Sequence, residues 1–123
     1  MAKILLAEDE EVLRMLVVDT LEDEGHTIEE AKDGEEALNF ILNNEYDLII
    51  LDYMMPVYTG LDIIMKVREL PEKEAVKIMM LSAKSQVTDQ QAVLRAGANY
   101  FMAKPFSPKE LVIRIEEILG EIE

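Results

Sequence analysis

The sequence predicts an α/β fold in which a doubly wound parallel sheet of five strands alternates with five helices. Five short apolar runs recur along the 123 residues, and each is followed by a stretch with apolar residues at helical spacing. The run at residues 48–51 has no polar alternation, which is typical of a parallel strand covered on both faces. With 50% hydrophobic residues, this length suits one compact domain, residues 1–123, with its own core.

The first 31 residues predict a strand, a helix and a second strand. Residues 4–7 are apolar and open into an acidic turn, after which apolar side chains recur at helical spacing over residues 13–21. Gly25 is placed to end that helix as a left-handed residue. Residues 27–31 are more polar than the other strands, so we expect them at an edge of the sheet.

The middle of the chain predicts two helices around the central strand. Asp33 and Glu36 are spaced as an N-cap and its partner. The helix that they begin is expected to bury a stripe formed by Gly34, Ala37, Leu38, Ile41 and Leu42. After the central strand, a third helix carries apolar residues from Ile63 to Leu70, and Pro71 terminates it.

The last third predicts strand, helix, strand and helix. Residues 78–81 form an apolar strand, and the fourth helix lies within residues 85–96, ended by Gly97. Residues 100–103 are the fifth apolar run. A capping box with proline at the first helical position opens the final helix, formed by Ser107, Pro108 and Glu110.

Composition excludes several classes of protein. The 12 basic and 26 acidic residues give a net charge of −14, which repels phosphate backbones and anionic lipid, so we expect no direct nucleic-acid binding. The chain has no cysteine, hence no disulfide framework and no thiolate metal site. No apolar run approaches the about 18 residues of a membrane span, and residues 1–7 lack the basic region followed by a long apolar stretch that is typical of a secretory leader. We expect a soluble cytoplasmic domain without membrane insertion and without an attached output domain.

Polar residues follow the predicted strands where those strands end. Glu8 and Asp9 follow the first strand, Asp52 the third, Ser82 the fourth and Lys104 the fifth. The carboxyl ends of parallel strands share one edge, where ligands bind in open α/β sheets. Carboxylates meeting there repel one another by roughly 4 kcal/mol per close pair at an effective dielectric near 20, so a cation is needed. An all-oxygen site suits Mg²⁺, and Asp52 is then placed to act as a phosphoryl-accepting nucleophile.

The joint pattern resembles the receiver domain of two-component response regulators, the CheY-like family, over the whole chain. The matching residues are Glu8-Asp9, the stretch from Asp52 to Pro56 with Gly60, Ser82-Ala83 and Lys104-Pro105-Phe106. The resemblance implies a flavodoxin-like (βα)5 fold with the strand order 2-1-3-4-5. It also implies a role in a bacterial phosphorelay, as a phosphoprotein and not as an enzyme beyond assisting its own phosphorylation and slow dephosphorylation.

The resemblance assigns a role to each site residue. Asp52 is the phosphoacceptor, taking a phosphoryl group from a histidine kinase, a phosphotransfer protein or a small phosphodonor, with Lys104 and Ser82 assisting. The Mg²⁺ ligands are Asp9, Asp52 and the backbone carbonyl of Met54. Glu8 stands where aspartate is commoner and is expected to act through a water.

The resemblance also implies a switch and a lifetime control. Ser82 and Phe101 are the switch pair, although threonine and tyrosine are commoner there. They are expected to change the surface of the fourth helix, fifth strand and fifth helix, which would bind a downstream protein. We expect a monomer that can dimerise on phosphorylation. Met54 and Lys84 stand beside the acyl phosphate and offer no group that readily orients an attacking water, so hydrolysis is expected to be slow.

Two other classes remain as alternatives. A haloacid-dehalogenase-like phosphatase uses an aspartate nucleophile but needs a second aspartate two residues later, where this chain has Met54. A flavin-binding electron carrier of similar topology needs a phosphate loop after the first strand, and the acidic residues 8–10 would repel that phosphate.

Overall fold

The computed structural model of the chain describes residues 1–83 and 86–122. In this part of the chain five strands, all parallel, pair in the order β2-β1-β3-β4-β5, which confirms the expected topology. The strands are β1 (Lys3–Ala7), β2 (Thr27–Ala31), β3 (Leu48–Asp52), β4 (Ile78–Ser82) and β5 (Tyr100–Ala103).

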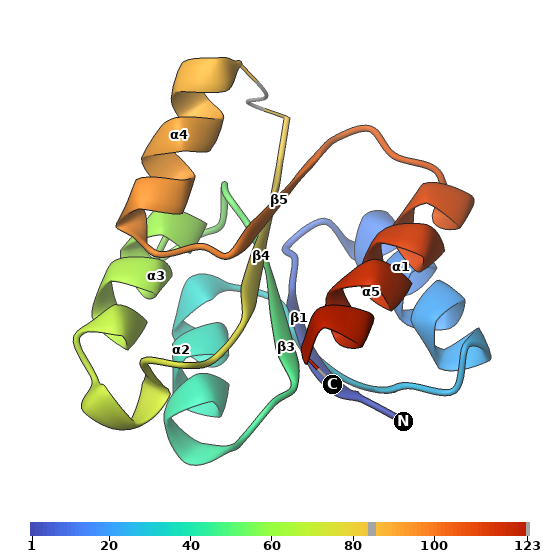
Figure 1. Cartoon of the computed structure of the whole chain (residues 1–123), viewed down its shortest axis with the longest axis horizontal. Coiled ribbons are helices and arrows are strands. Elements are labelled where there is room, and N and C mark those ends of the chain that lie inside the picture. The colour runs from blue at the N-terminus through green and yellow to red at the C-terminus, as the bar shows by residue number, and fades with distance from the viewer. Residues whose placement is uncertain (84–85, 123) are drawn as a thin grey trace.

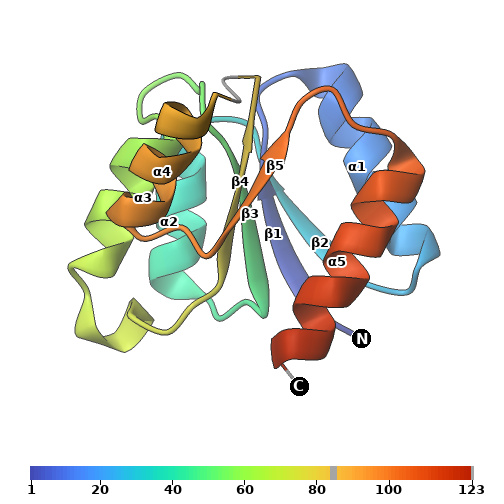
Figure 2. The ribbon, with the colours of Figure 1, turned by 45° about the horizontal axis from the view of Figure 1, so that its top comes forward.

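Helices cover both faces of the sheet. Figures 1 and 2 show α2, α3 and α4 on one face and α1 and α5 on the other. The helices are α1 (Glu11–Asp23), α2 (Gly34–Asn43), α3 (Gly60–Arg68), α4 (Val87–Ala96) and α5 (Pro108–Ile122), and a short 3₁₀ helix, η1 (Pro71–Lys73), follows α3. Within the described ranges, no helix has the length and apolar character needed to cross a membrane.

The core is divided into two layers by the alternation of side chains along each strand. In β1, Leu5 and Ala7 join the cluster under α2, α3 and α4, while Ile4 and Leu6 join the cluster under α1 and α5. Every residue of β3 is buried, as expected for a strand covered on both faces. β2 is the most exposed of the first four strands and lies at an edge, as its polar sequence predicted.

Local capping fixes where several helices begin. The Asp33 carboxylate accepts a 2.8 Å hydrogen bond from the Glu36 amide, so it caps α2 as predicted. The Glu36 carboxylate instead accepts from the Lys32 amide at 3.1 Å, one residue before the cap. Ser107 accepts from the Glu110 amide at 3.1 Å at the start of α5. These caps satisfy backbone amides at the starts of α2 and α5, at the sheet edge that carries the polar residues.

Two local expectations were wrong. Leu42 was placed in the buried stripe of α2 but is 47% exposed, because the apolar stripe of this helix is narrower than the sequence pattern suggests. Leu70 was placed in α3, yet the helix ends at Arg68. The fourth helix was predicted within residues 85–96, and it begins at Val87. Residue 85 lies outside the described residues.

Candidate functional site

Asp52 is the last residue of β3, at the centre of the sheet. It pairs in register with Leu81 of β4 and is only 5% exposed. The next residue continues the ladder, since the Tyr53 amide donates to the Leu81 carbonyl at 2.8 Å. The carboxylate is therefore carried by a rigid strand and not by a loose loop.

Glu8 and Asp9 lie on the turn that follows β1. The Glu8 amide donates to the Ala31 carbonyl at 3.1 Å, which extends the pairing of β1 with β2 by one residue. The Glu8 side chain is fully buried, and one of its oxygens accepts from the Glu10 amide at 3.1 Å. Asp9 is exposed. The turn thus points one carboxylate into the protein and leaves the next one accessible to solvent.

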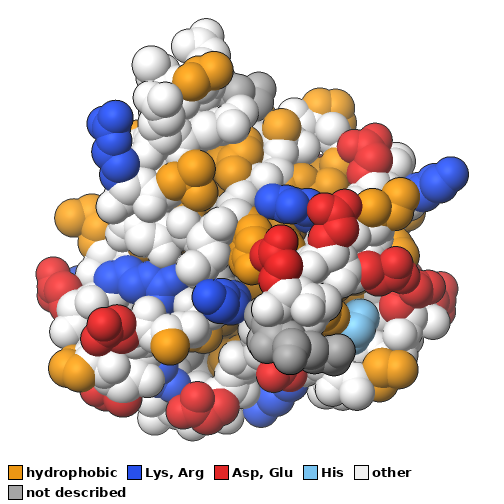
Figure 3. Space-filling model, viewed as in Figure 1, with side chains coloured by type: hydrophobic (Ala, Val, Ile, Leu, Met, Phe, Trp, Pro, Cys, Tyr) orange, Lys and Arg blue, Asp and Glu red, His pale blue; other side chains and the backbone are white. Residues whose placement is uncertain are grey.

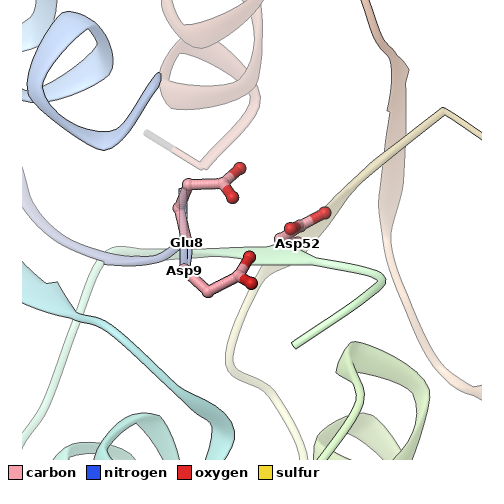
Figure 4. Close-up of side chains that lie close together, drawn as sticks. All are labelled: Glu8, Asp9 and Asp52. Atoms are coloured by element: carbon pink, nitrogen blue, oxygen red, sulfur yellow. The ribbon is translucent and has the colours of Figure 1, made fainter. Parts of the chain in front are cut away.

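The three predicted carboxylates meet at one place. Among the described residues, Glu8, Asp9 and Asp52 each offer an oxygen, and these atoms lie within 4.8 Å of one another. Figure 4 shows the three side chains close together, with Glu8 and Asp9 extending from the turn after β1 toward Asp52 at the end of β3. A donor set of hard oxygens open to solvent on the Asp9 side fits Mg²⁺, which keeps part of its water shell when it binds.

Lys104 neutralises part of this negative charge. Its ammonium donates to Glu8 Oε1 at 2.9 Å and to Asp52 Oδ1 at 3.0 Å. Burial alone lowers the pKa of Lys104, but its hydrogen bonds to Glu8 and Asp52 outweigh burial, and the pKa is raised. Burial raises the pKa of Glu8 to about 7, against the opposing effect of Lys104 and with a further rise caused by Asp52. The two buried carboxylates therefore share one cation.

The predicted switch residues lie on the neighbouring strands. Ser82 ends β4, is 2% exposed and pairs in register with Ala103. Its carbonyl accepts from the Lys104 amide at 2.9 Å, which fixes the start of the segment that carries the Lys104 side chain. Phe101 is half-buried and packs against the core cluster on the α2, α3 and α4 side.

Of the two residues expected to control the lifetime of the acyl phosphate, Met54 and Lys84, the structure describes only Met54. The Met54 side chain extends into solvent from the loop after β3. Lys84 lies outside the described residues.

One contact at the site was missed from the sequence. Arg14 of α1 donates to the Glu8 carbonyl at 2.8 Å and forms an ion pair with Glu30 at 3.4 Å. It therefore holds the turn that carries two of the three carboxylates of the candidate metal site, Glu8 and Asp9. No sequence motif indicates this contact, because it depends on how α1 packs back over the turn.

Comparison with known proteins identifies the same family from the sequence. The sequence model of the response regulator receiver domain family matches residues 4–116 of this chain. The transcriptional regulatory protein ResD of Bacillus subtilis (strain 168) is 40% identical over 117 residues, which are 95% of this chain and 48% of ResD. SrrA of Staphylococcus aureus (strain NCTC 8325 / PS 47) is 37% identical over 117 residues, 95% of this chain and 47% of SrrA. The chain thus spans about half the length of these curated relatives.

Solved structures agree with that assignment. The chemotaxis response regulator CheY4 of Vibrio cholerae has a TM-score of 0.91 and 34% identity, covering 96% of this chain and 98% of CheY4. The receiver domain of the sensor histidine kinase PA1611 of Pseudomonas aeruginosa PAO1, with magnesium coordinated in its active site cleft, has a TM-score of 0.88 and 29% identity, covering 97% of this chain and 98% of that domain. The fold, the acidic cluster and the family match together show that this chain belongs to the response regulator receiver domain family, a family of signalling domains.

Proposed function

We propose that this receiver domain is a phosphoryl-accepting switch and that Asp52 is its acceptor. The observation that carries the proposal is the position of Asp52, which ends the central strand, binds Lys104 and faces two further carboxylates. A rigidly held carboxylate beside a cation and a candidate metal site is what phosphoryl transfer to an aspartate requires.

The chemistry follows from these groups. A carboxylate oxygen of Asp52 attacks phosphorus, forming an O–P bond as the bond from phosphorus to the donor breaks. For a phosphohistidine donor, the leaving nitrogen keeps the electron pair. Bound Mg²⁺, held by Asp9, Asp52 and the Met54 carbonyl with Glu8 acting through a water, would neutralise charge on the transferring group. The Lys104 ammonium supplies the second positive charge, and its bond to Asp52 orients that carboxylate.

The proposed switch links the new phosphoryl group to β5. The phosphoryl oxygens draw the Ser82 hydroxyl inward, Phe101 fills the vacated space and Lys104 pairs with the phosphate. The surface that changes is formed by α4, β5 and α5. This mechanism predicts that amide exchange on phosphorylation changes over that surface and that the change is lost in Ser82→Ala. A change confined to α2 would contradict it.

The proposed partners follow from the same assignment. The phosphoryl donor is a sensor histidine kinase or a phosphotransfer protein, and a downstream protein binds the face formed by α4, β5 and α5. ResD and SrrA are named as transcriptional regulatory proteins, which supports an output in gene regulation. We propose that the domain is monomeric and dimerises on phosphorylation, and molecular mass measured with and without phosphodonor tests this.

Incubation with acetyl phosphate tests the proposed function as a whole. In Mg²⁺ the protein should gain one phosphoryl group, and in excess EDTA it should gain none. Turnover of phosphomonoesters would favour the phosphatase alternative, and a bound yellow chromophore would favour the flavin carrier. Equal labelling with and without EDTA would contradict the metal requirement.

A further inference from the structure

We infer that Gly34, the first residue of α2, is a positioning residue for the metal site. Its backbone supports the segment that follows Asp52, residues 53–59, which we call the 53–59 loop. The inference rests on the proposed function, because the metal ligand that this loop supplies is the proposed Met54 carbonyl.

Gly34 and the loop are in backbone contact. A Cβ added at Gly34 would lie 2.2 Å from the carbonyl oxygen of Tyr58 and 2.7 Å from its nitrogen. The Gly34 amide also donates to the Pro56 carbonyl at 3.1 Å. The φ of Gly34 is not in the left-handed region, so its backbone conformation does not require glycine. The close approach of the loop is what requires it.

The loop is closed on itself, so that a shift at one end is transmitted to the other. At its base, the Gly60 amide donates to the Tyr53 carbonyl at 2.9 Å. At its tip, the Tyr58 amide donates to the Pro56 carbonyl at 2.9 Å. Met54 therefore lies between the base and a tip that rests directly on Gly34.

A methyl group at Gly34 would displace the tip of the loop. Non-bonded heavy atoms prefer a separation of about 3.5 Å, so the Tyr58 backbone would have to move by about 1 Å. Mg²⁺ requires near-ideal octahedral geometry, and a ligand held on a displaced backbone meets that geometry poorly. Loss of groups that orient metal ligands lowers metal affinity by about 10- to 100-fold, and we expect Gly34→Ala to fall in that range.

The test is Mg²⁺ binding by isothermal titration calorimetry. The matched control is Gly120→Ala in α5, where an added Cβ meets no atom within 4 Å. Gly34→Ala should bind Mg²⁺ about 10-fold or more weakly, and Gly120→Ala should bind like the wild type. Circular dichroism establishes that each variant is folded. Equal Mg²⁺ affinity in folded Gly34→Ala and in the wild type would overturn the inference.

A second variant loosens the loop without touching α2. Tyr58 is half-buried, packs against the core cluster below the loop and has its ring 5.1 Å from the Lys66 ammonium. Tyr58→Ala removes that anchor and should also weaken Mg²⁺ binding several-fold. If Gly34→Ala does not fold, an unchanged affinity in Tyr58→Ala overturns the inference. A wild type that binds no Mg²⁺ would instead refute the proposed function.

Discussion

At the scale of single residues, the site is governed by the ratio of carboxylates to cations. Glu8 and Asp52 are buried beside each other with one ammonium between them. Burial raises the pKa of Glu8 to about 7 even with Lys104 in place. A second cation is therefore favourable there, which explains physically why these residues suit metal binding.

Replacing Lys104 with methionine should destabilise the metal-free protein. Breaking a buried ion pair by removing one partner leaves uncompensated charge, and the cost is about 3 kcal/mol. Urea unfolding in EDTA measures it, with Lys109→Met, an exposed lysine on α5, as the control. Mg²⁺ should restore part of the loss, because a ligand that binds only the folded state stabilises it. Equal stability of the two variants in EDTA would contradict the account.

The lifetime of the phosphorylated state should depend on Met54 and Lys84. An amide and a carboxylate can orient an attacking water, which neither native side chain readily does. The double variant Met54→Asn with Lys84→Glu should therefore lose its phosphoryl group about 10²-fold faster. Decay measured after rapid removal of acetyl phosphate gives the rate. If the double variant decays no faster than the wild type, the side chains at positions 54 and 84 do not orient the attacking water, and the prediction is wrong.

At the scale of elements, the strands position the reactive side chains, and the loops after the strands determine the backbone conformation beside them. The 53–59 loop contains Val57, whose φ of 72° is in the left-handed region that a β-branched residue rarely adopts. The residue is 65% exposed, so its side chain gains little from burial. The loop therefore stores backbone strain close to the site.

Val57→Gly should relieve that strain. A left-handed conformation costs a non-glycine residue about 1–2 kcal/mol, and the added freedom of the unfolded chain offsets part of the gain. We expect a net stabilisation of about 0.5–1 kcal/mol in urea unfolding. Val12→Gly, at an exposed position inside α1, should instead lower the stability. Two losses of similar size would show that Val57 is not strained.

Part of the fold and of the candidate site could be predicted from the sequence. The apolar runs and the residues at their ends predicted parallel strands alternating with helices and grouped Glu8, Asp9 and Asp52, because these depend on periodicity and topology. The strand order came from the resemblance to the receiver family. The exposure of Leu42 was not predicted, since it depends on how far neighbouring segments extend over a side chain. Two contacts were not predicted for the same reason. Arg14 contacts the turn at Glu8, and Gly34 contacts the 53–59 loop. Each contact joins two elements that are distant in sequence, and no local sequence pattern indicates how such elements pack.

At the scale of the whole molecule, the net charge of −14 acts on stability and on partners. Figure 3 shows acidic side chains gathered over α1 and α5. The last turn of α1 has no basic residue and carries Glu22 and Asp23, which are unfavourable at the negative end of a helix dipole. Self-repulsion of this kind lowers the stability of the compact state and opposes binding to phosphate backbones.

Added NaCl should therefore stabilise the protein. At about 0.1 M ionic strength the Debye length is about 10 Å, so repulsion across the surface is largely screened. The melting temperature should rise with NaCl, and the rise should be smaller in the triple variant Glu22→Gln, Asp23→Asn, Glu24→Gln. In low salt the triple variant should be more stable than the wild type by about 1 kcal/mol. A melting temperature independent of salt would contradict this view of the surface.

Locating the phosphoryl group on the chain tests whether Asp52 is the phosphoacceptor. After incubation with acetyl phosphate and Mg²⁺, intact and peptide mass spectrometry should find one phosphoryl group, on the peptide that contains Asp52. Asp52→Asn should gain none, whereas Asp19→Asn, an exposed aspartate on α1, should be labelled like the wild type. Labelling of Asp52→Asn at the wild-type level, or a phosphoryl group mapped to another residue, would contradict the assignment of Asp52 as the acceptor.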